Sequence, residues 1–142
     1  MAYNILIVDD SSPMRAVIKK TIKASGSKTG QIFEAADGKE ALDILKKEWI
    51  DLVLTDHNMP VMNGLELVVE MKKDEMSRDT PVIMITTEGS RKMVEGFMEE
   101  GVRDYIKKPF TPEQIRSKLN NILGETDDEE EGIDNGDEEL DF

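Results

Sequence analysis

The chain has 142 residues, a net charge of −13, 38% hydrophobic residues and no cysteine, which suits one globular domain and excludes disulfides and thiolate metal sites. No apolar stretch reaches the ~20 residues that span a bilayer, and no basic stripe of the kind that neutralises nucleic-acid phosphates occurs. We therefore expect a cytoplasmic protein that binds neither membranes nor nucleic acid.

Short apolar runs rich in Val and Ile alternate along the chain with longer amphipathic stretches, a pattern typical of buried parallel strands joined by helices. The predicted strands cover residues 5–8, 31–36, 52–55, 81–86 and 104–107. The predicted helices begin near residues 12, 37, 64, 91 and 111. Five strands alternating with five helices predict an α/β fold with a doubly wound parallel sheet and right-handed crossovers.

Capping residues and apolar faces set the expected ends of these helices. Ser12 is predicted to cap the first helix, which ends near residue 24. Trp49 lies in line with the apolar face of the second helix and is predicted to be part of the core. The last helix is expected to end at Leu123, so that residues 1–124 form the domain. Residues 125–142 hold eleven acids and no base, and we expect a disordered acidic tail.

Five polar residues stand where the apolar runs stop, or within a residue of that point. They are Asp9, Asp10, Asp56, Thr86 and Lys108. The carboxyl ends of parallel strands meet at one edge of a sheet, where ligands bind in open α/β folds. The sequence therefore predicts one site made of three carboxylates, a hydroxyl and an ammonium group.

Three clustered carboxylates repel one another unless a cation or a proton relieves them. Oxygen ligands favour Mg²⁺ over Zn²⁺, for which His57 would be the lone nitrogen donor. Asp56 ends the central strand and is the candidate nucleophile toward phosphorus, with Lys108 and Thr86 stabilising the transferred group. The competing interpretation is that these acids only cap the helices that follow them.

The order and spacing of these motifs resemble the receiver domain of two-component response regulators, most of all single-domain chemotaxis regulators of the CheY type. The resemblance covers about residues 3–124. It rests on Asp9-Asp10, Asp56-His57-Asn58-Met59-Pro60 with Gly64, Thr86, Tyr105 and Lys108-Pro109-Phe110. It implies a flavodoxin-like sheet with strand order 2-1-3-4-5.

The resemblance also implies the chemistry of the site. Asp56 would accept a phosphoryl group from a sensor histidine kinase. Mg²⁺ would be held by Asp10, Asp56 and the backbone carbonyl of Asn58, with Asp9 acting through water. Lys108 would pair with the phosphoryl group. Small phosphoryl donors and self-catalysed hydrolysis are expected as well, although the protein would not be an enzyme in the ordinary sense.

A switch and an output surface follow from the same resemblance. Thr86 would move toward the phosphoryl group, Tyr105 would swing inward, and the bond between Lys108 and Pro109 would be cis. The signal is expected to leave a monomer through a downstream partner, with the flagellar motor switch favoured over a phosphorelay or another enzyme. The expected partner surface includes Arg91, Val94, Met98, Tyr105, Lys107 and Lys118.

Two other classes of protein use related features. An aspartyl-nucleophile phosphatase of the haloacid dehalogenase class needs a nucleophile on the first strand and an acid two residues later, whereas Asp9 is followed by Asp10 and Ser11. A flavodoxin-like electron carrier needs a hydroxyl- and glycine-rich phosphate loop at the same place. Neither pattern matches this chain.

Overall fold

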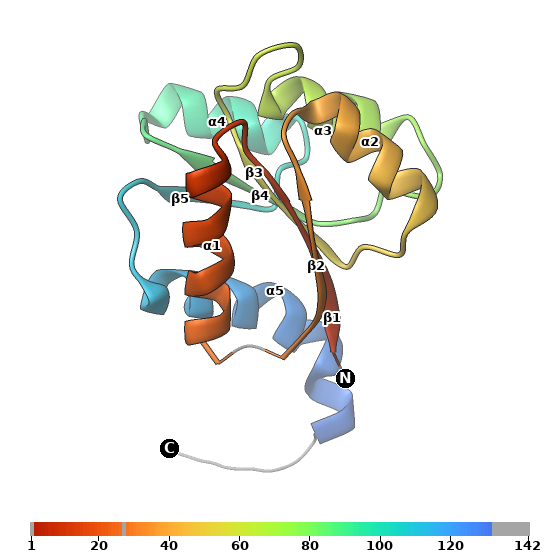
Figure 1. The fold of residues 1–142 in the computed structure, drawn as a ribbon, viewed down its shortest axis with the longest axis vertical. Coiled ribbons are helices and arrows are strands. Elements are labelled where there is room, and N and C mark those ends of the chain that lie inside the picture. The colour runs from red at the N-terminus through yellow and green to blue at the C-terminus, as the bar shows by residue number, and fades with distance from the viewer. Residues whose placement is uncertain (1, 27, 132–142) are drawn as a thin grey trace.

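The computed structural model describes residues 2–26 and 28–131, with side chains through residue 124. Five parallel strands form one sheet in the order β2-β1-β3-β4-β5, as expected (Figure 1). The strands are β1 (Tyr3–Val8), β2 (Thr29–Ala35), β3 (Leu52–Asp56), β4 (Val82–Thr86) and β5 (Asp104–Lys107). The helices are α1 (Ser12–Ala24), α2 (Gly38–Lys47), α3 (Gly64–Lys72), α4 (Arg91–Glu99) and α5 (Pro112–Glu131).

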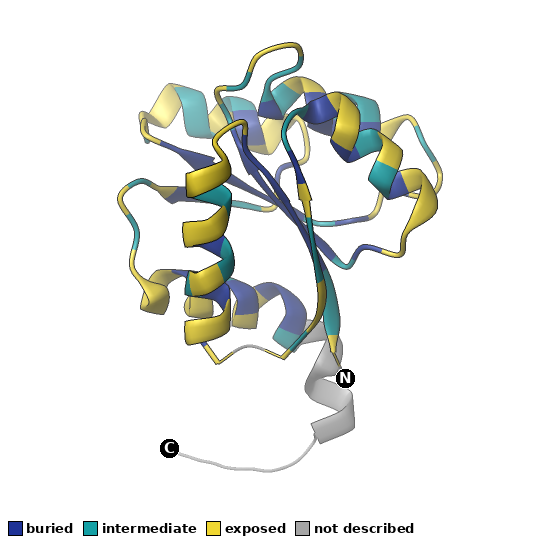
Figure 2. Ribbon diagram, in the orientation of Figure 1, coloured by how far each residue is buried: buried dark blue, intermediate teal, exposed yellow. Residues whose placement is uncertain are grey.

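The sheet separates two hydrophobic clusters, and its central strands are buried between them (Figure 2). Successive side chains of a strand point to opposite faces. Leu6 and Val8 of β1 therefore join the cluster covered by α2, α3 and α4, while Ile5 and Ile7 join the cluster covered by α1 and α5. Burial on both faces explains the continuous apolar runs in the sequence.

The strand register aligns the carboxyl ends of β1, β3, β4 and β5. It pairs Val8 with Thr55, Asp56 with Ile85, and Thr86 with Lys107. Asp9 therefore leaves the sheet beside Asp56, and Lys108 leaves it beside Thr86. This alignment brings the predicted site residues to one edge of the sheet.

The first helix is capped one residue earlier than predicted. Ser11 is its N-cap, and the Ser11 hydroxyl accepts a hydrogen bond from the backbone N–H of Met14 at 3.2 Å. The expectation that Ser12 caps the helix is wrong because Ser11 has the extended backbone of a cap while Ser12 already belongs to the helix.

The prediction that Trp49 is a core residue is also wrong, since 73% of its surface is exposed. The second helix ends at Lys47 and Glu48 is extended, so the helical face does not continue to Trp49. Ile50 fills the core position instead. The indole N–H of Trp49 donates to the carboxylate of Asp51 at 2.9 Å.

The last helix does not end at Leu123, because α5 continues through Gly124 to Glu131. The glutamates in this stretch are good helix formers, so the acidic composition does not stop the helix. Residues 132–142 of the expected tail lie outside the described residues, and the domain boundary at residue 124 stays a prediction. In the part of the chain that the structure describes, no helix is long and apolar enough to cross a membrane.

Candidate functional site

Asp9, Asp10 and Asp56 come together at the carboxyl edge of the sheet, as predicted. One carboxylate oxygen from each lies within 4.8 Å of the others. Asp9 and Asp56 are 2% and 8% exposed, whereas Asp10 lies at the surface. The group is therefore buried at its base and open to solvent on one side.

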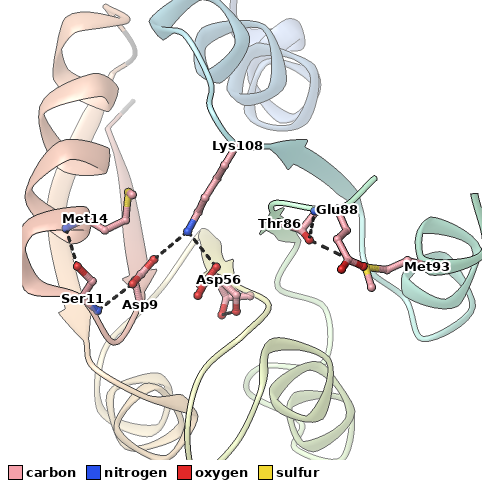
Figure 3. A network of polar contacts seen from close by, with 9 residues as sticks. Asp9, Ser11, Met14, Asp56, Thr86, Glu88, Met93 and Lys108 are labelled. Atoms are coloured by element: carbon pink, nitrogen blue, oxygen red, sulfur yellow. Dashed lines mark hydrogen bonds and ion pairs between the residues drawn. The ribbon is translucent and has the colours of Figure 1, made fainter. Parts of the chain in front are cut away.

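Lys108 completes this cluster from the end of β5 (Figure 3). Its ammonium nitrogen lies 3.1 Å from Oδ1 of Asp56 and 3.6 Å from Oδ2 of Asp9. The backbone N–H of Lys108 donates to the carbonyl of Thr86 at 2.8 Å, and the bond between Lys108 and Pro109 is cis, as expected. The ammonium group bridges the two buried carboxylates.

The electrostatics of the cluster favour a bound cation. Burial raises the pKa of Asp56, Lys108 lowers it through a hydrogen bond and its charge, and Asp9 and Asp10 raise it by repulsion. Oδ2 of Asp9 is buried and accepts no hydrogen bond within the described part of the chain. Oxygen donors that repel one another and an unsatisfied buried acceptor fit a hard divalent ion such as Mg²⁺.

Thr86 ends β4 with its side chain buried and its hydroxyl turned toward α4 (Figure 3). The hydroxyl oxygen accepts a hydrogen bond from the backbone N–H of Glu88 at 3.0 Å and lies 4.0 Å from the sulfur of Met93. Sulfur is a weak acceptor, so the hydroxyl hydrogen of Thr86 has only a weak partner, while its oxygen is held by the N–H of Glu88.

The loop between β3 and α3 is held close to Asp56 by Gly64. A Cβ at Gly64 would lie 2.6 Å from the backbone oxygen of Asp56 and 2.7 Å from the sulfur of Met84. The N–H of Gly64 donates to the carbonyl of His57 at 2.9 Å. Glycine permits this approach. Asn58, which follows His57 in this loop, is exposed, as are Thr87 and Glu88 after β4.

His57 packs into the structure and takes no part in the acidic cluster. Its ring meets the ring of Phe97 edge to face, with 5.1 Å between the centroids. Its Nδ1 is buried and has no hydrogen-bond partner among the described residues. The ring therefore links the loop after Asp56 to the buried face of α4.

The expected partner surface lies on α4, β5 and α5, but two of its basic side chains already have acidic neighbours. Arg91 pairs with Glu95 at 3.3 Å and Lys118 pairs with Asp104 at 3.0 Å. Lys118 also lies 5.8 Å from the ring centroid of Tyr105. The remaining members are exposed or half-buried: Val94, Met98 and Lys107.

Sequence reasoning missed Arg15. Its Nη1 donates to the backbone carbonyl of Asp9 at 2.6 Å, and its Nε donates to Glu34 at 3.0 Å. An arginine inside a helix carries no sequence signal for such a role, because one partner follows β1 and the other lies in β2.

Comparisons with known proteins agree with this geometry. Residues 5–120 match the family model of the response regulator receiver domain. The chain is 46% identical over 121 residues to a chemotaxis protein CheY homolog of Campylobacter jejuni, covering 84% of this chain and 92% of the relative. It is 44% identical over 124 residues to chemotaxis protein CheY1 of Helicobacter pylori, covering 87% and 98%.

Solved structures show the same fold. Chemotaxis protein CheY4 of Vibrio cholerae has a TM-score of 0.79 at 33% identity, covering 87% of this chain and 100% of that one. The receiver domain of sensor histidine kinase PA1611 of Pseudomonas aeruginosa has a TM-score of 0.76 at 26% identity, covering 87% and 99%. That structure has a magnesium ion coordinated in its active site cleft.

Proposed function

This chain belongs to the response regulator receiver family, and from that premise we propose that Asp56 is its phosphoacceptor and that phosphorylation of Asp56 requires Mg²⁺. The protein acts in two-component signal transduction as a signalling protein, not as an enzyme of the usual kind. The proposal for Asp56 rests on one observation. Its buried carboxylate faces the ammonium of Lys108 at 3.1 Å beside two further carboxylates.

The metal ligands in this proposal are the carboxylates of Asp10 and Asp56 and the backbone carbonyl of Asn58, with Asp9 acting through water. When bound, Mg²⁺ supplies positive charge that offsets the carboxylates and the phosphoryl oxygens. Asp10 and Asn58 are exposed whereas Asp9 is buried, which suits ligands at the open side and a supporting carboxylate beneath.

In the transfer step, a carboxylate oxygen of Asp56 forms a bond to phosphorus while the bond between phosphorus and the kinase histidine nitrogen breaks. The nitrogen keeps the electron pair of that bond, and because the other ring nitrogen of the phosphohistidine carries a proton, neutral imidazole leaves. Lys108 offsets the charge on the phosphoryl oxygens. Because this chemistry needs mainly position and charge, the protein contributes a fixed carboxylate and a fixed ammonium group.

The signal then passes to the surface of α4, β5 and α5. Thr86 exchanges its contact with Met93 for the phosphoryl group, and Tyr105 turns inward as the loop before α4 moves. We place the output in chemotaxis, because relatives at 44% and 46% identity are chemotaxis proteins. The proposed target is the flagellar motor switch, which reads the changed surface.

Labelling with acetyl phosphate or a cognate kinase tests the phosphoacceptor. We expect wild-type protein to incorporate phosphate only with Mg²⁺, and Asp56→Asn, which keeps the shape of the side chain, to incorporate none. Undiminished labelling of Asp56→Asn would refute the assignment. For the output, beryllofluoride should increase binding to the motor switch protein of the same organism, and equal binding with and without it would remove that target.

A further inference from the structure

We infer that Arg15 is a positioning residue for the phosphoacceptor site, because it holds the peptide group that joins Asp9 to Asp10. The inference rests on the proposed Mg²⁺-dependent function of the site. The carbonyl that accepts from Nη1 of Arg15 at 2.6 Å is the carbonyl of this peptide group. Its orientation determines where the main chain of Asp10 goes after the strand ends.

The main chain at Asp9 is held from two sides. The N–H of Asp9 donates to the carbonyl of Ala35 in β2 at 3.1 Å, and its carbonyl accepts from Arg15 in α1. The carboxylate is held as well, since Oδ1 accepts from the N–H of Ser11 at 2.8 Å. Without Arg15 the carbonyl of the peptide group between Asp9 and Asp10 would lose its hydrogen-bond donor, and the peptide group could rotate.

Arg15 is itself fixed by a second contact. Its Nε donates to Oε1 of Glu34 at 3.0 Å, and Oε2 of Glu34 lies 3.9 Å from the ammonium of Lys19. The side chain of Arg15 is 17% exposed, so the guanidinium is largely shielded from water. A planar guanidinium can donate to two acceptors in different directions at once, which a lysine ammonium on a flexible stem does less well.

This arrangement matters because the proposed site depends on where two adjacent carboxylates point. Asp9 is buried toward Lys108 and Asp10 is exposed, so the turn must send the two side chains in different directions within one residue. Mutual repulsion of the three carboxylates favours moving Asp10 away from Asp56. Arg15 opposes that movement by donating to the backbone carbonyl of Asp9. It therefore occupies none of the carboxylate oxygens proposed to face the metal.

Calorimetric titration of the full chain with MgCl₂ tests this role. Replacing groups that orient metal ligands typically costs 10- to 100-fold in affinity, so Arg15→Gln should weaken Mg²⁺ binding about tenfold. Arg15→Lys should restore part of that loss, because the ammonium can still reach one acceptor. Lys19→Gln is the matched control, since Lys19 lies on the same helix and pairs with the same Glu34; its Mg²⁺ affinity should be unchanged.

A second readout separates positioning from mere structural support. Labelling of Asp56 by acetyl phosphate should need about tenfold more Mg²⁺ in Arg15→Gln, while the rate at saturating Mg²⁺ stays near that of wild type. If Arg15→Gln and Arg15→Lys melt at lower temperature but bind Mg²⁺ as wild type does, Arg15 only ties α1 to β2 and the inference is overturned. A wild-type chain that binds no Mg²⁺ overturns the proposed function and this inference together.

Discussion

Asp56 and Lys108 stand 52 positions apart in the chain, yet Nζ of Lys108 lies 3.1 Å from Oδ1 of Asp56. Three carboxylates share this corner of the described structure, and the ammonium of Lys108 contacts two of them. Negative charge therefore remains in excess. This imbalance makes the site receptive to a divalent cation and sensitive to pH.

Asp56→Asn should raise the melting temperature of the metal-free protein at pH 7. Burial raises the pKa of Asp56 above its usual value of 3.8, so the folded state takes up a proton more readily than the unfolded state. The stability from this group is fully present below pH 3.8 and is lost as pH rises through the raised pKa. Asparagine does not ionise, so the Asp56→Asn variant avoids this loss of stability at neutral pH. Thermal melts of both proteins between pH 3.5 and pH 7 measure it.

The advantage of Asp56→Asn should shrink toward pH 3.5, where Asp56 is mostly protonated in both the folded and the unfolded state. It should also shrink with Mg²⁺, which stabilises the wild-type carboxylate. A variant that is less stable than wild type at pH 7 without metal would contradict the prediction.

Asp10→Ala should weaken Mg²⁺ binding more than Asp9→Ala does, because Asp10 is the proposed direct ligand and Asp9 the proposed indirect one. Asp9 also accepts a hydrogen bond from Ser11 and pairs with Lys108. Asp9→Ala should therefore lower the melting temperature of the metal-free protein more than Asp10→Ala. Calorimetric titration and thermal melts give the two rankings, and a reversed order of Mg²⁺ affinities would exchange the assigned roles.

Gly64→Ala should destabilise the protein by about 1–3 kcal/mol, the usual cost of forcing extra atoms into a packed site. The new Cβ would lie 2.6 Å from the backbone oxygen of Asp56, so labelling of Asp56 should slow as well. Gly96→Ala is the matched control, because a Cβ at Gly96 meets nothing within 4 Å. It should stabilise α4 by about 0.5–1 kcal/mol. Urea unfolding measures both, and equal effects would show that the close approach has no cost.

His57→Phe should keep Asp56 labelling and should not lower stability. Phenylalanine preserves the edge-to-face contact with Phe97 and removes a buried nitrogen that has no partner in the described part of the chain. An unsatisfied buried polar atom costs about 1–3 kcal/mol. His57→Ala is the comparison, since it loses the ring contact and should unfold at lower urea concentration. Loss of labelling in His57→Phe would assign the imidazole a chemical role.

The sequence alone determined the succession of strands and helices along the chain and the edge of the sheet at which the site residues gather. Short runs such as residues 5–8 and 52–55 are continuously apolar because both faces of the sheet are covered, so each run ends where the main chain reaches the surface. Asp9, Asp56 and Thr86 follow or end such runs, and parallel strands bring those ends to one edge. Their proximity was therefore predictable, and the confirmed strand order came from the family resemblance.

Only the tertiary structure decided which side chains contact one another. Trp49 follows the apolar spacing of a helix, but the chain leaves that helix at Lys47 and buries Ile50 instead. Arg15 reaches the carbonyl of Asp9 because β2 places Glu34 beside α1. The spacing of apolar residues determines which face of a helix or strand is buried. Which hydrogen-bond partner a polar group finds depends on segments far apart in the chain, and these meet only when the buried faces have packed. The hydrogen bond from Arg15 to Asp9 and the exposure of Trp49 were both decided by this packing of separate segments.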